Sequence, residues 1–287
     1  MTGVAVIIGY ALRESLRRRV FLVVVLLTAA FLGLYALGTN EAFDAVEARV
    51  GPGEDPFEVD DRELTGATMF GLSMFATLFL GAVLAAFLTL ATVRGDAERG
   101  LLQPLVVRPI GRPVLLLGRF LAAAAVCAFY VAVVYAGTLT ITWAIGDWTP
   151  DRVVGPALQL AAATAVIAAL SLLGSVFLSA TANGIAVFMV FGAGLVSGLL
   201  GQIGEALNSE TLMNVAQVAS WALPFEALYQ DGLDAITADT TGFTEAALTL
   251  GPFGGAQGAG PFLWPWTLIY LGLVGAAALA AFARKDL

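Results

Sequence analysis

Six stretches of this sequence are long and apolar enough to cross a lipid bilayer, and they constrain the fold more than any other feature. A membrane-spanning helix needs about 20 mostly apolar residues. The chain is 59% hydrophobic and only 13% charged, whereas a soluble domain of this length carries about 25% charged residues. We therefore predict an all-α integral membrane protein, with one membrane domain over residues 1–287. The six predicted transmembrane helices are 20–38, 65–93, 114–145, 153–180, 184–204 and 262–283.

The charged residues are divided unequally between the two sides of this arrangement. The N-terminal segment, the 94–119 connection and the C-terminal tail hold 11 of the 14 basic residues but only 4 of the 22 acidic ones. Cytoplasmic segments of membrane proteins carry such an excess of arginine and lysine. We therefore predict that both termini and the 94–119 connection are cytoplasmic, and that the acidic connections lie outside.

Two segments near the N-terminus have distinct compositions. Residues 1–19 carry apolar side chains at helical spacing with arginines between them, which predicts an interfacial elbow helix that contacts membrane lipids. The alternative is a cytosolic extension of the first span. Residues 39–64 form a predicted acidic outer loop that is either solvated or faces a partner. A cation site there stays open, although the spacing of its acids is not that of an EF-hand.

The longest predicted outer segment is 205–261, which is too polar for a full span. We expect short helices there that dip into the outer interface, with Trp221, Phe225 and Tyr229 as anchors.

The fifth predicted span carries small residues at a regular spacing. Gly194 and Gly198 form a G-x-x-x-G pattern, and Gly201 continues the same surface. Such a surface allows another helix to approach closely. That helix belongs either to the same bundle or to a second subunit.

Several kinds of chemistry are excluded by composition. The chain has no histidine and a single cysteine, which removes histidine-based catalysis, paired-cysteine zinc sites and internal disulfides. It has no G-x-x-x-x-G-K-[ST] motif, and its single lysine is Lys285. We therefore expect no catalytic residue, no metal and no cofactor bound by this chain, and no nucleic-acid partner.

The predicted spans also contain almost no ionisable side chains, which an ion-coupled carrier usually needs along its pathway. The hydroxyls within the spans either line an apolar pathway or bond carbonyls of their own helices. They are Thr77, Thr89, Thr138, Thr140, Thr142, Thr164 and Ser171. A chain that moves a substrate without a motor of its own requires an external energy source on its cytoplasmic face.

The segment 97–123, AERGLLQPLVVRPIGRPVLLLGRFLAA, resembles the cytoplasmic segment of type-2 ABC exporter permeases. Those permeases have a Glu, a run of the kind G-T-L-x-x-L-L, a Pro with a small or basic turn, and then L-L-x-G-(K/R)-F. In this chain Pro104 interrupts the run. The tail FARKDL and the initial stretch GYALRESLRRRVFLVV are similar to the ending and the elbow helix of the same family. The matching residues are Glu98, Gly100, Leu101, Leu102, Leu105, Pro109, Arg112, Leu116, Gly118, Arg119 and Phe120.

The resemblance implies a permease subunit in a prokaryotic plasma membrane, working by alternating access with a second permease copy and a separate ABC-type ATPase. ATP and Mg²⁺ would bind that ATPase. The coupling segment, 94–113, would contact it together with the short turn at 179–184. The residues assigned to this contact are Asp96, Glu98, Arg99, Gly100, Leu101, Leu102, Arg108, Pro109, Arg112, Pro113, Thr181 and Asn183.

Other interpretations stay open. Arg99, Arg108 and Arg112 either contact acids on an ATPase or anchor the chain to lipid phosphates. The whole chain is alternatively a membrane scaffold with acidic outer loops, or a secondary carrier with uncharged coupling. The substrate is not defined by the sequence.

Overall fold

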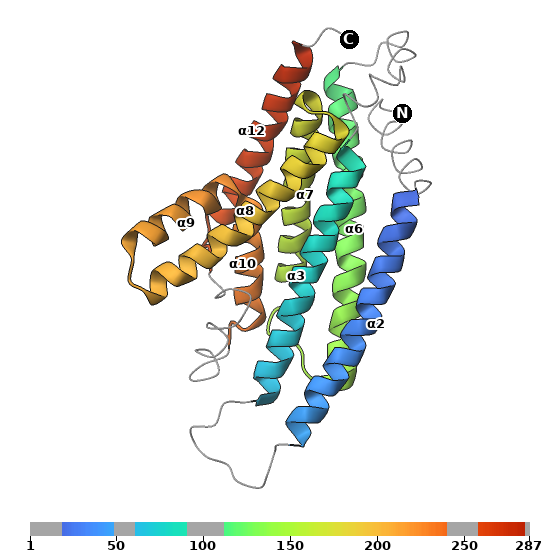
Figure 1. Cartoon of the computed structure of the whole chain (residues 1–287), viewed down its shortest axis with the longest axis vertical. Coiled ribbons are helices and arrows are strands. Elements are labelled where there is room, and N and C mark those ends of the chain that lie inside the picture. The colour runs from blue at the N-terminus through green and yellow to red at the C-terminus, as the bar shows by residue number, and fades with distance from the viewer. Residues whose placement is uncertain (1–18, 49–60, 91–111, 240–257, 285–287) are drawn as a thin grey trace.

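The computed structural model of the chain describes residues 19–48, 61–90, 112–239 and 258–284. Within these ranges all regular secondary structure is helical, with eight α-helices and no strand (Figure 1). The helices are α2 (Arg19–Glu47), α3 (Asp61–Thr89), α6 (Arg112–Gly146), α7 (Val154–Phe177), α8 (Ala180–Ala206), α9 (Glu210–Ala222), α10 (Pro224–Ile236) and α12 (Leu263–Ala283).

The two ends of the bundle differ in charge. At one end, at the top of Figure 1, α2 begins at Arg19, α6 begins at Arg112 and α12 is followed by Arg284. At the opposite end α2 finishes at Glu47 and α3 begins at Asp61. We call these the basic end and the acidic end.

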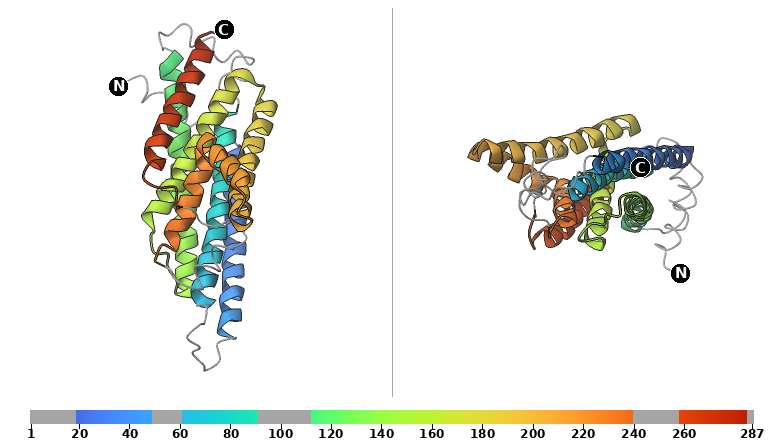
Figure 2. Two further views of the ribbon diagram at one scale, coloured as in Figure 1. Left: turned by 90° about the vertical axis from the view of Figure 1, so that its left-hand side faces the viewer. Right: turned by 90° about the horizontal axis from the view of Figure 1, so that it is seen from below.

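Six helices have the length and composition needed to cross a membrane, namely α2, α3, α6, α7, α8 and α12. Figure 2 shows the helices packed along one another, with α8 and α9 projecting from one side of the bundle. Large apolar side chains such as Leu26, Phe129 and Met189 are exposed on their outer surfaces. A chain in water rarely exposes so much contiguous apolar surface, whereas lipid tails accept it. The prediction of an all-α membrane protein with six spans is confirmed.

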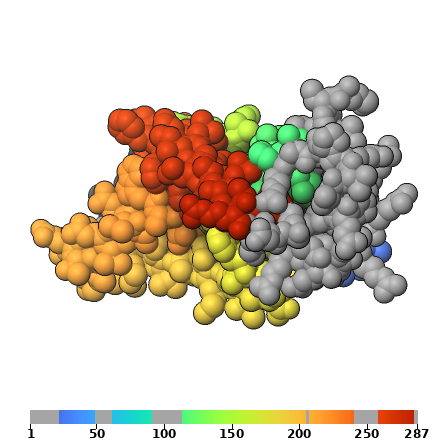
Figure 3. Space-filling view, turned by 90° about the horizontal axis from the view of Figure 1, so that it is seen from above, coloured from blue at the N-terminus to red at the C-terminus, as the bar shows by residue number. Residues whose placement is uncertain are grey.

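The core is centred on α7, which packs against α3, α6, α8, α10 and α12. Leu160 and Ile167 of α7, Met74 of α3 and Val131 of α6 belong to one buried cluster. A second, smaller cluster forms at the basic end, where Phe282 of α12 packs against α6 and α7. Figure 3 looks down on this end. Helix α7 therefore connects the two ends of the molecule through buried contacts.

The position of α10 corrects one expectation. Phe225 is fully buried and Tyr229 is 2% exposed, so neither is an interfacial anchor. Both side chains belong to the core cluster, because α10 packs along α7 inside the bundle. Trp221, on the neighbouring α9, is half exposed as expected of an interfacial residue. Helix α9 has no buried residue.

The helix boundaries also differ from prediction. Helix α2 continues to Glu47, so the predicted acidic loop begins later than residue 39. The extension is stabilised by packing, since Phe43 and Val46 are buried on one face of the helix. Helix α8 begins at Ala180 rather than at residue 184.

The hydroxyls within the spans mostly bond their own helices. Those of Thr77, Thr89, Thr138, Thr140, Thr142 and Thr164 each donate to a carbonyl three or four residues earlier. Such bonds satisfy a hydroxyl without a partner from another helix. The observed geometry therefore fits the second of the two interpretations for these six residues, and Thr142 in addition bonds the hydroxyl of Tyr35 on α2.

Candidate functional sites

The predicted coupling residues fall into two groups. Asp96, Glu98, Arg99, Gly100, Leu101, Leu102, Arg108 and Pro109 lie outside the described residues. Arg112 and Pro113 are the first two residues of α6, where proline is well tolerated because the first turn needs no N–H donor. Thr181 and Asn183 lie in the first turns of α8. All four of these described positions are at the basic end.

Asn183 ties three helices together at the basic end. Its side-chain amide donates to the backbone carbonyl of Ser171 on α7 at 2.9 Å, and lies 3.4 Å from the carbonyl of Leu90, which follows α3. The side chain is 1% exposed, because Gly174 leaves room for it on the surface of α7. Thr181 is exposed on the same helix. Asn183 thus joins the end of α3 to the α7–α8 turn, and its side chain does not reach the surface.

An apolar groove lies beside this junction. It has a volume of about 650 Å³ and runs between the last residues of α3 and the first turns of α8. Thr181 contributes the only hydroxyl among the described residues of its lining. The groove therefore opens next to the point where the chain leaves α3 toward the predicted coupling segment. Its lining residues are Phe87, Leu90, Ala180, Thr181, Gly184, Ile185, Phe188 and Met189.

The small-residue surface of α8 faces α10 of the same chain. A Cβ atom at Gly194 would lie 2.4 Å from the ring of Phe225, and one at Gly198 would lie 2.5 Å from a carboxylate oxygen of Glu226. Gly201 is buried and lines a pocket between the same helices. These glycines therefore allow α8 to approach α10 closely within one bundle.

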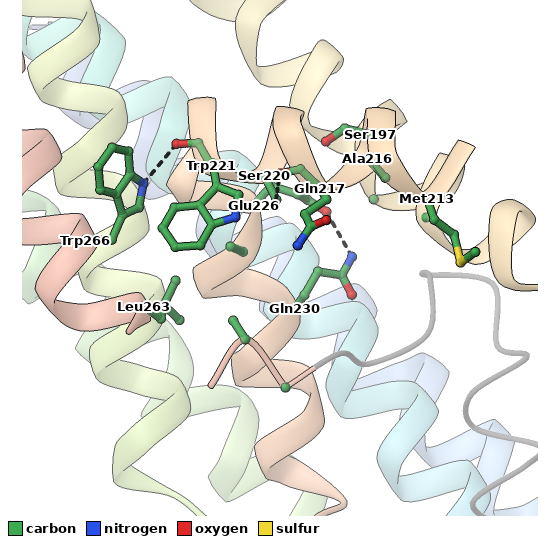
Figure 4. A pocket seen from close by; sticks show the side chains of 15 residues that line it. Ser197, Met213, Ala216, Gln217, Ser220, Trp221, Glu226, Gln230, Leu263 and Trp266 are labelled. Atoms are coloured by element: carbon green, nitrogen blue, oxygen red, sulfur yellow. Dashed lines mark hydrogen bonds between the residues drawn. The ribbon is translucent and has the colours of Figure 1, made fainter. Parts of the chain in front are cut away.

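The pocket beside Gly201 is a second candidate site, which we call the Glu226 pocket (Figure 4). It has a volume of about 390 Å³, within the range of small-molecule sites. Helices α8, α9, α10 and α12 enclose it. Its lining residues are Ser197, Gly198, Gly201, Met213, Ala216, Gln217, Ser220, Trp221, Glu226, Ala227, Gln230, Gly258, Ala259, Leu263 and Trp266.

Two buried polar side chains from adjacent turns of α10 reach this pocket. Gln230 donates from its Nε2 to Oε1 of Glu226 at 2.9 Å. Glu226 is 2% exposed and Gln230 is 8% exposed. Their remaining acceptors, Oε2 of Glu226 and Oε1 of Gln230, have no hydrogen-bond partner within the described part of the chain. The pocket therefore holds two acceptors that lack donors.

The surroundings of Glu226 raise the pKa of its carboxyl. Helix α10 is not one of the six candidate spans. Burial raises the pKa of the Glu226 carboxyl to about 7, and the hydrogen bond from Gln230 partly opposes the shift. Burial penalises the charged form of an acid because the group loses water. Near neutral pH the carboxyl therefore exchanges readily between its two forms.

Two tryptophans form the wall of the pocket opposite α8. The indole Nε1 of Trp266 donates to the backbone carbonyl of Trp221 at 2.9 Å. The two rings meet nearly edge to face, with centroids 5.3 Å apart. The Trp266 ring is therefore held by a hydrogen bond, and the Trp221 ring packs against it beside the buried carboxyl (Figure 4).

Sequence reasoning did not identify the Glu226 pocket. A signal was present, because the carboxyl of Glu226 is followed one turn later by Gln230 on the same face as Phe225 and Tyr229. Metal chemistry has no support in the described ranges, where no group of three or more His, Cys, Asp or Glu side chains is placed to hold an ion. The described lining has no histidine to activate a nucleophile, and the hydroxyls of its two serines, Ser197 and Ser220, donate to carbonyls of their own helices.

Comparison with known proteins identifies the family. The family model described as ABC-2 family transporter protein matches residues 5–287, which include all eight helices. A search of curated proteins finds no match. A match over nearly the whole chain, together with six helices able to cross a membrane, establishes the relationship. The chain belongs to the ABC-2 family of transporter proteins.

Proposed function

We propose that this chain is the membrane-spanning permease subunit of an exporter that is driven by a separate ABC-type ATPase. Family membership over residues 5–287 carries the proposal. The absence of a P-loop motif from the sequence supports it, because ATP and Mg²⁺ then bind the partner ATPase. The permease itself performs no covalent chemistry.

The basic end is proposed to face the cytoplasm of a prokaryotic cell, with the ATPase docked on it. The excess of arginine in the N-terminal segment, the 94–119 connection and the tail supports this orientation. Lipid headgroups on the cytoplasmic side supply further contacts for these arginines. The acidic loops then face outward.

Coupling is proposed to pass through the coupling segment and the α7–α8 turn. The Asn183 amide supports this route, because it links the carbonyl of Leu90 to that of Ser171. A movement imposed on the coupling segment at the end of α3 is then transmitted to α7, which packs on five other helices. Two permease copies form the pathway between them, and closure of two ATPases changes its access from one side to the other.

The test is complex formation and transport by charge variants of the coupling segment. We expect Glu98→Ala and Arg112→Glu to abolish ATPase association or coupling while both proteins remain in the membrane. Arg152→Glu makes the same change of charge at an exposed position of the acidic end and should behave as wild type. Normal complex formation and transport in both coupling variants would contradict the assignment.

Two other functions differ from this one in a measurable way. A membrane scaffold transports nothing, and a secondary carrier requires no ATPase. Reconstitution in liposomes separates the three, since only the proposed function makes transport depend on ATP hydrolysis by a bound partner. Proteoliposomes that transport in the absence of any ATPase would support the carrier.

A further inference from the structure

We propose that the Glu226 pocket binds the ammonium group of a small amphipathic amine. The pocket supplies a carboxylate and an amide oxygen for the ammonium, and an aromatic wall for the apolar body of the ligand. This inference does not depend on the proposed function, because binding requires neither an ATPase nor transport.

The unpartnered acceptors point to a ligand with hydrogen-bond donors. Oε2 of Glu226 and Oε1 of Gln230 are buried and have no partner among the described residues. Leaving a buried acceptor unsatisfied is unfavourable, and most such groups in proteins are paired. A primary ammonium has three N–H donors and a positive charge, so it can satisfy both oxygens and neutralise the carboxylate.

The remaining polar groups of the pocket do not replace such a ligand. The amide of Gln217 and the indole of Trp221 also line it, but no described residue donates a hydrogen bond to either free oxygen. The hydroxyl of Ser197 donates to the carbonyl of Gly194, and that of Ser220 donates to the carbonyl of Gln217. Glu226 is the one titratable side chain in the described lining. No lining residue there carries a positive charge, so the charge of the carboxylate is not compensated within the pocket.

The position of the pocket favours an amphipathic molecule. Leu263 and Trp266 belong to the first turn of α12, at the end of this helix away from Arg284. This helix has 21 residues, which gives a length of roughly 31 Å, close to the thickness of about 30 Å of a bilayer core. The pocket therefore lies near one boundary of the hydrocarbon layer, where charged headgroups meet apolar tails.

The tryptophans add selectivity for a cation. Indole rings attract cations through their negatively polarised faces, and tryptophan does so best among the aromatic residues. The hydrogen bond from the Trp266 indole to the backbone of Trp221 restrains the Trp266 ring, so this side chain loses little freedom on binding. The predicted outer segments together carry 18 acidic residues and only three arginines, and such an excess of negative charge attracts cations.

Two sources of the ammonium group share this chemistry. One is a soluble amphipathic amine, and the other is the headgroup of an amino-lipid such as phosphatidylethanolamine. The experiment distinguishes them by the membrane in which the protein is embedded. Nanodiscs of phosphatidylcholine offer no primary amine, whereas nanodiscs that include phosphatidylethanolamine do.

The test measures binding of 2-phenylethylamine to the purified full-length chain in phosphatidylcholine nanodiscs at pH 8. We expect saturable binding, and binding weaker by roughly tenfold or more for neutral 2-phenylethanol, which keeps the ring but lacks the charge. This comparison uses the wild-type protein and does not depend on the folding of a variant. Phosphatidylethanolamine in the nanodisc is expected to compete if the lipid headgroup is the resident ligand and to have no effect if a soluble amine is.

Variants localise the site. Glu226→Gln removes the charge but keeps the size of the side chain, and we expect it to weaken amine binding by roughly tenfold or more. Glu210→Gln makes the same change at an exposed position of α9 and should leave binding unchanged. The proposal is overturned if wild type binds the amine and the alcohol equally, or binds neither in any nanodisc, or if Glu226→Gln binds the amine as tightly as wild type.

Discussion

Buried polar side chains lie at two places in this molecule where helices approach closely. Asn183 joins α8 to α7 and to the end of α3 through backbone carbonyls. Glu226 and Gln230 pair with each other under Gly198 of α8. Each of these side chains is buried where loss of a partner leaves an unsatisfied group, so each is sensitive to substitution.

Replacement of Asn183 tests the junction at the basic end. Asn183→Ala removes the donor to Ser171 and leaves buried carbonyls without it, at a cost of about 1–3 kcal/mol. We expect a lower melting temperature of the purified protein in detergent. Thr181→Ala, at an exposed position one half-turn away, should melt as wild type does. Equal melting temperatures for all three proteins would show that the amide does not support the junction.

The pH dependence of stability tests the environment of Glu226. Its pKa is raised from the ordinary value of 4.5 to about 7, so between these values the folded protein holds a proton that the unfolded chain releases. The free energy of unfolding therefore falls as pH rises through this window, by on the order of 2 kcal/mol between pH 5.5 and 8. Glu226→Gln should remove this contribution and melt higher than wild type at pH 8. A difference between the two proteins that does not change with pH would contradict the assignment.

At the scale of elements, the approach of α8 to α10 depends on small residues. Gly194→Ala would bring a Cβ to 2.4 Å from the buried ring of Phe225. Because that ring is enclosed in the core, we expect a loss of about 1–3 kcal/mol. Gly192→Ala, on the same helix, meets nothing within 4 Å. It should be neutral or stabilising by up to about 1 kcal/mol, because alanine favours helix. Thermal melts of both variants provide the comparison, and equal destabilisation would argue against this packing.

The spans were predictable from sequence because each is a long apolar run. Helix α10 was not, because its 13 residues include Glu226, Gln230, Asp231 and Asp234 and so appear too polar for the core. Its buried side follows the helical repeat through Phe225, Leu228, Tyr229 and Ile236. The placement of that face against α7 depends on tertiary contacts that a single sequence does not display.

The candidate sites also differ in whether they depend on local sequence or on tertiary packing. The coupling segment is predicted from the cluster of charge and proline and from family resemblance, both of which are local features of the sequence. The Glu226 pocket joins residues from 197 to 266, and its enclosure depends on how four helices pack. In the sequence this site is represented only by an acid within a polar segment, which hydropathy alone does not assign to the core.

At the scale of the whole molecule, the asymmetry of charge makes a prediction about orientation. The native Cys127 is fully buried, so single cysteines can be introduced elsewhere for labelling. Thr149→Cys places a thiol at an exposed position between α6 and α7, at the acidic end, and Ala182→Cys places one at the basic end. We expect a membrane-impermeant maleimide to label Thr149→Cys in intact cells and Ala182→Cys only after permeabilisation. The reverse pattern would show that the basic end faces outward.

The central claim is that a separate ATPase drives this permease. The most direct measurement is ATP hydrolysis by the complex purified from native membranes through a tag on this chain, in liposomes. The claim predicts that an ATPase with a P-loop co-purifies with wild type, hydrolyses ATP in the complex, and is lost or uncoupled with Arg112→Glu. Wild-type protein that purifies from native membranes without an ATPase, or whose ATPase is unaffected by Arg112→Glu and Glu98→Ala, would contradict it.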